Sequence, residues 1–208
     1  MKKLIELVFV LLFGVSFASI SKEEVVSICL DAGHGGIDGG CEVDNIKEKE
    51  INIQIVEKLR LLFETSGYKV VLTRYGDYDL ASENSKNRKK EDMKKRVDII
   101  NTCDIFISIH QDKYSSKAIK GAQVLTNDKG YKLGQIVQEK LTDATNTKRK
   151  LLIDNEKYLL VNSKSIGCIV ETGFLSNDNE RNKLISDDYQ FIIANAIFEA
   201  VSEYIKIK

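Results

Sequence analysis

The stretch VVSICLDAGHGG, residues 25–36, runs an apolar segment directly into a histidine flanked by glycines. Its first seven residues, VVSICLD, are mostly apolar and rich in strand formers, so we expect a strand that is buried on both faces. Gly33, Gly35 and Gly36 then allow a sharp turn and a close approach of the backbone. A strand buried on both faces is typical of a sheet covered by helices on both sides, so this stretch predicts an α/β fold.

The rest of the chain alternates between predicted strands and helices, which is the pattern of a mostly parallel sheet. Helices are expected over 48–66, 88–102, 130–143, 177–185 and 188–205, and strands over 68–73, 104–109, 121–126 and 165–171. We expect YLLV, residues 158–161, to be short and extended. The polar segment 74–90 is expected to be a surface loop, for which a functional role and a solvated connector are equal alternatives. One domain over residues 24–208 accounts for this order.

The composition excludes some classes of protein. The chain has 208 residues, of which 31 are basic and 31 acidic, and this balance leaves no basic surface for nucleic acid. The four cysteines form no CxxC pair, so we expect no cysteine-based metal site. Residues 1–18 combine Lys2 and Lys3 with an apolar run and small residues before Ala18, which indicates an export signal peptide. An uncleaved anchor or a buried helix is the alternative.

Reactive side chains follow three of the predicted strands. Asp31 ends the first strand, which leads to His34. His110 and Glu171 come at the ends of two later strands. Because the carboxyl ends of parallel strands meet at one edge of a sheet, we expect these side chains to converge there. The chain has two histidines, and two histidines with a carboxylate are a usual ligand set for a catalytic zinc ion, Zn²⁺.

The carboxylate ligand is expected at the start of the helix over residues 48–66. Glu48 lies three residues before Ile51, which begins the apolar face, so Glu48 points toward the sheet. Glu50 falls on the solvent face, which makes Glu48 the better ligand. Glu171 is then free to act as general base and acid, with helix capping or ion pairing as its alternative role. A phosphate-binding glycine loop is disfavoured because the P-loop lysine and hydroxyl residue are absent.

Four motifs resemble those of the zinc-dependent N-acetylmuramoyl-L-alanine amidases, which cut peptide stems from the glycan strands of peptidoglycan. They are LDAGHGGIDGG (30–40), KEKEINI (47–53), ISIHQD (107–112) and VETGFLSN (170–177), in the order of the family. The resemblance implies a mixed, largely parallel six-stranded sheet and hydrolysis of the amide between N-acetylmuramic acid and L-alanine. It implies zinc ligands His34, Glu48 and His110, with Glu171 as the catalytic carboxylate. Another zinc peptidase acting on stem peptides, or a non-catalytic peptidoglycan-binding or regulatory protein, is the alternative.

The segment NRKKEDMKKRVDIIN, residues 87–101, is most similar to the spore-cortex amidases of endospore-forming bacteria. This similarity implies a role in the cell wall or spore envelope, together with a partner deacetylase, in making the muramic δ-lactam that germination enzymes recognise. Asp112 departs from the family pattern, which usually has asparagine at this position. A carboxylate there leads us to expect loosely held metal, or a need for a protein partner. Cys41 lies near the expected site without an assignable role.

Three residues are candidates for substrate binding. Arg74 follows a strand end, Arg96 borders the apolar face of its helix, and Asp112 follows the second histidine. For Arg96 a structural ion pair is the favoured alternative. We also expect Ser176 to cap the helix over 177–185.

Overall fold

A six-stranded sheet with the order β4-β1-β5-β8-β6-β7 forms the centre of the protein. The structure is a computed structural model that describes residues 25–207, so the predicted export signal lies outside the described residues. β1 is parallel to β4 and β5, and β5 is parallel to β8, whereas β6 is antiparallel to β8. The prediction of an α/β fold with a mixed, mostly parallel sheet is confirmed. The strands are β1 (Ser27–Ala32), β4 (Lys69–Leu72), β5 (Ile105–Asp112), β6 (Gln123–Thr126), β7 (Leu152–Ile153) and β8 (Ile166–Phe174).

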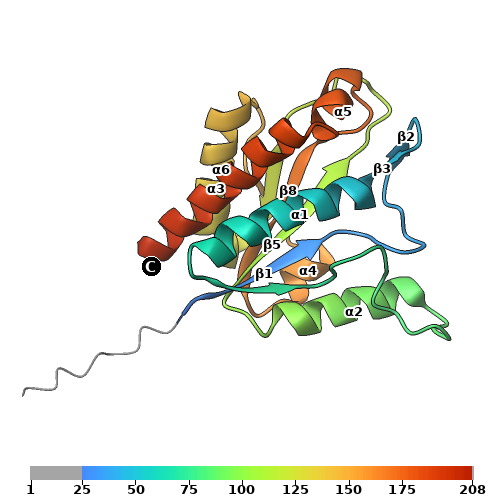
Figure 1. Cartoon of the computed structure of the whole chain (residues 1–208), viewed down its shortest axis with the longest axis vertical. Helices are drawn as coiled ribbons and strands as arrows, with labels where there is room; N and C mark the ends of the chain where they lie inside the picture. Colours follow the sequence, from blue (N-terminus) through green and yellow to red (C-terminus); the bar gives the residue numbers. More distant parts are fainter. Residues whose placement is uncertain (1–24, 208) are drawn as a thin grey trace, which may run out of the picture.

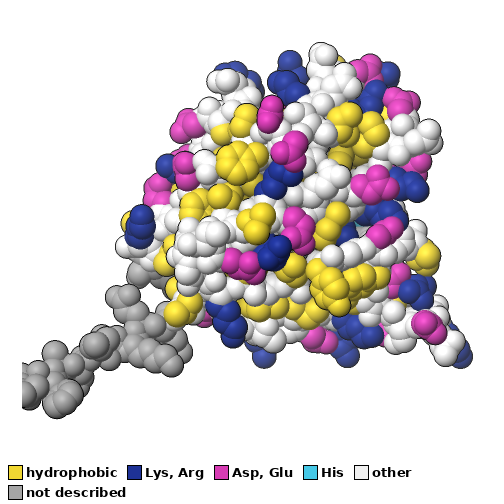
Figure 2. Space-filling model, viewed as in Figure 1, with side chains coloured by type: hydrophobic (Ala, Val, Ile, Leu, Met, Phe, Trp, Pro, Cys, Tyr) yellow, Lys and Arg dark blue, Asp and Glu magenta, His cyan; other side chains and the backbone are white. Residues whose placement is uncertain are grey.

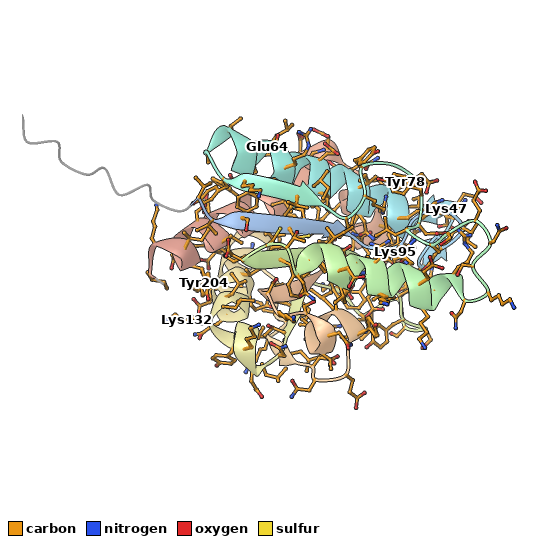
Figure 3. All side chains as sticks on the ribbon, turned by 90° about the horizontal axis from the view of Figure 1, so that it is seen from below. Lys47, Glu64, Tyr78, Lys95, Lys132 and Tyr204 are labelled. Atoms are coloured by element: carbon orange, nitrogen blue, oxygen red, sulfur yellow. The ribbon has the colours of Figure 1, made fainter. Side chains whose placement is uncertain are left out.

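Helices cover both faces of this sheet (Figure 1). On one face, α1 (Glu48–Thr65), α3 (Tyr131–Thr145) and α6 (Asp187–Lys206) bury the larger apolar core. On the other face, α2 (Arg88–Ile100) and α4 (Tyr158–Asn162) cover a smaller apolar cluster. α5 (Asp178–Leu184) follows β8 and contacts α6. Figure 3 shows β1 between α1, which carries Glu64, and α2, which carries Lys95.

The strand predicted from the opening stretch is buried along its whole length, as the continuous apolar run indicates. Ile28 and Leu30 belong to the larger core, whereas Cys29 belongs to the smaller cluster under α2. Adjacent residues of β1 therefore face opposite sides of the sheet. Burial of each large aliphatic side chain contributes roughly 1.5–3 kcal/mol, so both helical layers hold β1 firmly at the point where the His34 loop begins.

The prediction that residues 158–161 are extended was wrong, because these residues form most of α4. Leu159 and Leu160 are both buried, whereas Tyr158 and Val161 are exposed. An extended segment would send consecutive side chains to opposite faces, but one helical turn places both leucines in the cluster beside α2.

Two further expectations about the ends of elements were wrong. His110 and Glu171 do not end their strands, since β5 continues to Asp112 and β8 to Phe174. The cap of α5 is Asn177, whose side chain accepts a hydrogen bond from the backbone nitrogen of Glu180. The hydroxyl of Ser176 is used elsewhere, because it accepts a hydrogen bond from the backbone nitrogen of Tyr114.

The shortest elements were not expected from the sequence. β7 has two residues, as do both strands of the hairpin β2 (Glu42–Val43) and β3 (Ile46–Lys47). Asp44 and Asn45 form the hairpin turn with φ angles of 53° and 63°, which suits a two-residue turn of the type that connects twisted strands. A short 3₁₀ helix, η1 (Asp128–Gly130), precedes α3. The hairpin matters for function, since it returns the chain from the His34 loop to the start of α1.

The surface carries charges of both signs between scattered apolar side chains on the face seen in Figure 2. This mixture agrees with the equal numbers of acidic and basic residues. Among the helices of residues 25–207, none is long and apolar enough to cross a membrane.

Candidate active site

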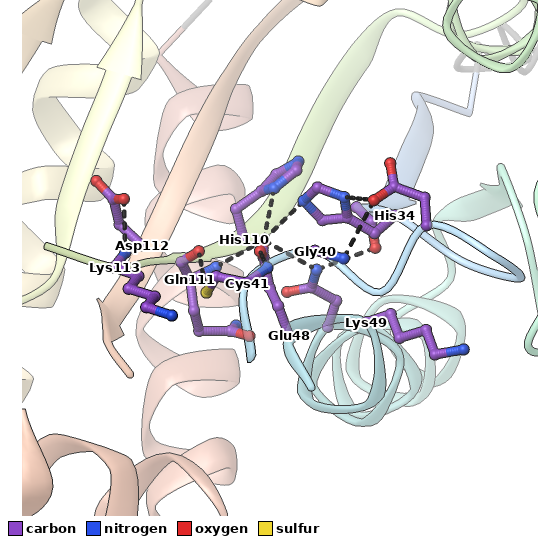
Figure 4. A network of polar contacts seen from close by, with 12 residues as sticks. His34, Gly40, Cys41, Glu48, Lys49, His110, Gln111, Asp112 and Lys113 are labelled. Atoms are coloured by element: carbon purple, nitrogen blue, oxygen red, sulfur yellow. Dashed lines mark hydrogen bonds and ion pairs between the residues drawn. The ribbon is translucent and has the colours of Figure 1, made fainter. Parts of the chain in front are cut away.

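Three predicted ligands, supplied by different elements, meet at one edge of the sheet (Figure 4). His34 lies in the loop after β1, Glu48 is the first residue of α1, and His110 lies in β5. Nδ1 of His110 lies 2.8 Å from Oε1 of Glu48, and Nε2 of His34 lies 3.1 Å from the same oxygen. One possible ligand atom from each residue lies within 4.8 Å of the other two. Elsewhere in residues 25–207, no other three histidine, cysteine or acidic side chains gather in this way.

Glu48 is held in one orientation through both of its carboxylate oxygens. Oε1 accepts a hydrogen bond from the backbone nitrogen of Gln111 at 3.1 Å, and Oε2 accepts one from that of Cys41 at 2.9 Å. The side chain is buried. Burial opposes its charge, but the two histidines outweigh burial and hold the pKa of Glu48 below its ordinary value. The carboxylate is therefore charged at neutral pH, which suits a ligand of a cation.

His34 has a backbone φ of 61°, in the left-handed region that few residues other than glycine adopt. Asp38 lies next to its ring, with Oδ1 at 3.0 Å from Nδ1 of His34, while Oδ2 of Asp38 pairs with Nζ of Lys89 at 2.8 Å. Burial opposes the charge of Asp38, but Lys89 and His34 outweigh it and lower the pKa of Asp38 to about 2. Nδ1 of His34 makes no hydrogen bond with the described residues in this geometry, so the contact with Asp38 places a negative charge beside the ring. Nε2 of His34 is the nitrogen that faces Glu48.

His110 packs its ring directly over Gly33. A Cβ atom on Gly33 would lie 2.3 Å from Cε1 and 2.4 Å from Nε2 of His110, which is far inside contact distance. The centres of the His110 and His34 rings are 5.0 Å apart, edge to face. Burial opposes the charge of His110, but Glu48 outweighs it and raises the pKa of His110. Only glycine at position 33 leaves room for this arrangement of the two rings.

Glu171 lies beside His110, because β5 and β8 pair with these two residues opposite each other. Both residues line one pocket together with His34. Oε2 of Glu171 is buried and has no hydrogen-bond partner among the described residues. Burial raises the pKa of Glu171 to about 7, against the opposing charge of His110 and with the help of Glu48. A carboxyl group of this pKa, with an unpartnered oxygen in a pocket, can both accept and release a proton near neutral pH.

The donor set fits a catalytic zinc ion. Such sites use three nitrogen or oxygen ligands from the protein and leave one position open. The two imidazoles each direct a ring nitrogen at Oε1 of Glu48, so the three groups share one small volume. Glu171 lines the pocket beside the two histidines and has a carboxylate oxygen without a partner among the described residues, which fits a group that acts next to the metal rather than on it.

Arg74 and Arg96 are each only 1% exposed. Their guanidinium groups donate hydrogen bonds to backbone carbonyls of the segment that leads to His34. Arg96 borders the pocket, but it also forms the ion pair expected as the alternative, with Asp31 at 2.7 Å and Asp92 at 2.8 Å. Substrate contact by the two arginines stays a prediction, and their surroundings favour a structural role.

Asp112 lies at the end of β5, where its carboxylate accepts a hydrogen bond from the backbone nitrogen of Lys113 at 2.6 Å. Its side chain points away from Glu48 and His110 (Figure 4), and it does not line the pocket with Glu171. Its charge still contributes to the raised pKa of Glu171. The thiol of Cys41, which is free, lies 3.6 Å from the backbone carbonyl of Gln111. Cys41 therefore supplies a backbone donor to Glu48 rather than a ligand atom.

Sequence reasoning missed two features of the site. Asp38 was not singled out, although its place four residues after His34 in a glycine-rich loop is a usable signal. The wall formed by α4 was also missed, because its first residues were expected to be extended. Lys157, Tyr158 and Leu159 line the pocket opposite α2, which contributes Met93.

Comparison with known proteins shows the family to which the chain is similar. The profile of the family described as N-acetylmuramoyl-L-alanine amidase matches residues 28–203. The germination-specific N-acetylmuramoyl-L-alanine amidase of Bacillus subtilis is 34% identical over 186 residues, which cover 85% of this chain and 78% of that protein. The solved structure of the CwlD amidase from Clostridioides difficile in complex with the GerS lipoprotein is 33% identical, with a TM-score of 0.85 over 88% of this chain and 100% of that one. The amidase AmiC2 of Nostoc punctiforme is 25% identical, with a TM-score of 0.78 over 87% of this chain and 97% of that one.

Proposed function

The chain belongs to the N-acetylmuramoyl-L-alanine amidase family and is an amidase of peptidoglycan, and we propose that its activity depends on zinc. In this proposal His34, Glu48 and His110 hold the ion and Glu171 is the catalytic carboxylate. The bond cleaved joins the lactyl group of N-acetylmuramic acid to the L-alanine of the stem peptide.

One observation carries the proposal. Two imidazoles and a carboxylate from three separate elements lie within 4.8 Å of one another, and Glu171, whose buried Oε2 has no hydrogen-bond partner among the described residues, lines the pocket that His34 and His110 also line. A binding protein without activity would have no use for a carboxyl group whose pKa is raised to about 7 in that position. The site therefore favours hydrolysis over the non-catalytic alternative.

Each residue of the site has its own role in the proposed reaction. A zinc ion in the site supplies a Lewis acid, which polarises a carbonyl and acidifies water. Glu171 accepts a proton from the water molecule whose oxygen attacks the lactyl carbonyl carbon. When the carbon–nitrogen bond breaks, Glu171 returns this proton to the nitrogen, and L-alanine leaves with a free amino group. Glu48 stays ionised throughout, because His110 and His34 outweigh its burial and hold its pKa below the ordinary value, while backbone hydrogen bonds to both of its oxygens fix its orientation.

The setting that we propose is the spore cortex of an endospore-forming bacterium. The chain would be exported and would act in the cell wall or spore envelope, on stems that are removed before muramic δ-lactam is made. The germination-specific relative in Bacillus subtilis supports this setting. We also propose that a protein partner completes metal binding or activity, since the CwlD amidase was solved in complex with a lipoprotein.

Mass spectrometry of digested peptidoglycan tests the reaction. Purified peptidoglycan is incubated with residues 19–208, with added zinc or with a chelator, and Glu171→Gln is the matched control. We expect intact stem peptides with free L-alanine amino termini in the zinc sample and none with the chelator. The Glu171→Gln variant should load zinc and release no stems.

Three results would contradict the proposal. Cleavage inside the stem would support the zinc-peptidase alternative. Cleavage that persists in the chelator after zinc has been removed would show that the activity does not depend on zinc. No cleavage by zinc-loaded protein, even after titration with candidate partner proteins, would exclude hydrolysis.

The spore setting has a separate test. The gene is replaced in its own organism by the Glu171→Gln form, and the muropeptides of purified spores are analysed. We expect loss of muramic δ-lactam with unchanged vegetative peptidoglycan. Normal δ-lactam content in these spores would contradict the cortex role and leave the amidase reaction standing.

A further inference from the structure

Arg74 and Arg96 are the two largest fully buried side chains among residues 25–207. Neither side chain directs its charge into open solvent, and each is 1% exposed. Burial of a guanidinium group is costly unless its donors are satisfied. Most of the acceptors of both groups lie in a single short segment, which runs from the end of β1 to His34.

Arg74 follows β4 and bonds this segment from one side. Its Nε donates to the carbonyl of Ala32 at 2.9 Å, and its Nη2 donates to the carbonyl of Gly33 at 2.9 Å. The same Nη2 also donates to the carbonyl of Lys49 at 2.9 Å, in the first turn of α1. Arg74 therefore ties the His34 loop to the helix that carries Glu48.

Arg96 reaches the same segment from α2. Its Nη1 donates to the carbonyl of Ala32 at 2.8 Å, and its Nη2 donates to the carbonyl of His34 itself at 2.6 Å. Asp31 and Asp92 pair with Nη1 and Nε. Burial opposes the charge of Arg96, but these two carboxylates outweigh burial and hold the pKa of Arg96 above its ordinary value.

The anchor of this arrangement is Asp31. Oδ1 accepts hydrogen bonds from Arg96 and from the hydroxyl of Thr73, and Oδ2 accepts one from the hydroxyl of Ser108. The carboxylate thus joins β1 to β5, to the residue after β4 and to α2. Three successive carbonyls, from Ala32 to His34, accept hydrogen bonds from the two guanidinium groups, and Asp31 and Asp92 hold the guanidinium group of Arg96 in place.

We propose that Arg74 and Arg96 form a clamp that positions the metal ligand His34, and that they are positioning residues rather than substrate contacts. The proposal rests on the proposed role of His34 as a ligand. His34 has a left-handed φ of 61°, which the local chain does not favour by itself. By fixing the carbonyl on either side of this residue, the clamp keeps its imidazole aimed at Glu48 before metal arrives. A guanidinium group suits this role because it is planar and its N–H donors point in fixed directions, so it binds two acceptors at once. The ammonium group of lysine is a compact point charge without such fixed directions.

Arg96→Lys is the first variant, and Arg181→Gln is its matched control. Arg181 is also buried, pairs with Asp44 and Asp178 and bonds the carbonyl of Leu175, but it does not contact the His34 loop. Competition with a chromophoric chelator measures the zinc affinity of each protein. We expect Arg96→Lys to bind zinc roughly 10–100-fold more weakly, as loss of groups that orient a ligand does. Arg181→Gln should stay within about twofold of the wild type.

A second readout needs no metal. The chain has two histidines, so carbon–proton spectra of histidine-labelled, metal-free protein carrying no histidine tag resolve the His34 and His110 rings individually. At one fixed pH, we expect Arg96→Lys to move the His34 signals several times farther than the His110 signals. Arg181→Gln should move neither. A general loss of stability would disturb both rings equally or leave both unchanged.

Asp92→Asn is a second variant for the case that Arg96→Lys does not fold. It weakens the ion pair at Nε of Arg96 and keeps the guanidinium group. We expect the same changes at reduced size. Folded Arg96→Lys or Asp92→Asn protein with wild-type zinc affinity and wild-type His34 signals would overturn the clamp. Failure of the proposed function looks different, since it appears as a wild-type protein without zinc affinity or a His34→Ala variant that binds zinc normally.

Discussion

Replacement of Glu171 by glutamine separates proton transfer from metal binding, because glutamine keeps the shape of the side chain and removes its charge. Glu171 lines the pocket beside the proposed ligands without being one of them. We expect Glu171→Gln to bind zinc with wild-type stoichiometry. Its turnover should fall by about 10²–10⁴-fold, which is the usual cost of losing a general base.

The same substitution changes stability by an amount that follows from the pKa. Burial raises the pKa of Glu171 from 4.5 to about 7, and a shift of this size corresponds to about 3 kcal/mol in the free energy of unfolding. Since the folded state holds this proton more tightly, the stabilisation is complete below pH 4.5 and is lost as the pH rises through about 7. Glutamine does not ionise. Metal-free Glu171→Gln should therefore be more stable than the wild type by up to about 3 kcal/mol near pH 8 and similar to it near pH 4.

Urea unfolding of chelator-treated protein at these two pH values measures the difference. In a thermal scan, about 3 kcal/mol corresponds to roughly 6–12 °C for a domain of this size. Glu83→Gln is the control, because Glu83 is exposed and lies in the loop before α2, and it should leave both measurements unchanged. If the free energy of unfolding depends on pH in the same way for Glu171→Gln and the wild type, the raised pKa of the buried Glu171 carboxyl group is refuted. Retained turnover would refute its role as base.

Gly33→Ala should weaken zinc binding by at least about tenfold and destabilise the fold by roughly 1–3 kcal/mol, because the added methyl group overlaps the ring of His110. In the same chelator competition, Gly39→Ala should have no such effect, since a Cβ there meets only a side-chain carbon of Lys47 at 3.8 Å. Saturating zinc should raise the Tm of the wild type and leave that of His110→Ala unchanged, and an equal rise in both would place the ion elsewhere. Asp112→Asn removes a charge that raises the pKa of Glu171, so the acidic limb of the pH–kcat profile should move to lower pH; a fixed limb would contradict this coupling.

Regular periodicity made the core of the site predictable. The apolar run before His34 can be buried on both faces only as a central strand, and β1 is buried throughout. Helical spacing separated Glu48 from Glu50, and the structure buries Glu48 while it leaves Glu50 exposed. The carboxyl-edge rule for parallel sheets predicted that His110 and Glu171 lie at one edge of the sheet, and the structure adds that they lie opposite each other on β5 and β8.

Features that depend on the path of loops were not predictable in this way. Every residue has a carbonyl, so no residue pattern marks those of Ala32, Gly33 and His34 as acceptors for arginines that lie about 40 to 65 positions away. Both arginines were candidates for substrate binding for the same reason, since a strand end and a helix border do not reveal burial. α4 has five residues, which is too few to distinguish a helical turn from an extended segment.

Anomalous diffraction from zinc-loaded crystals locates the metal and its ligands in one measurement. We expect one peak at the edge of the sheet, about 2.0–2.2 Å from a nitrogen of His34, a nitrogen of His110 and an oxygen of Glu48, with Glu171 nearby and unbound. A peak held by other side chains, such as that of Cys41, or crystals that take up no zinc at this edge, would show that these three residues are not the ligands.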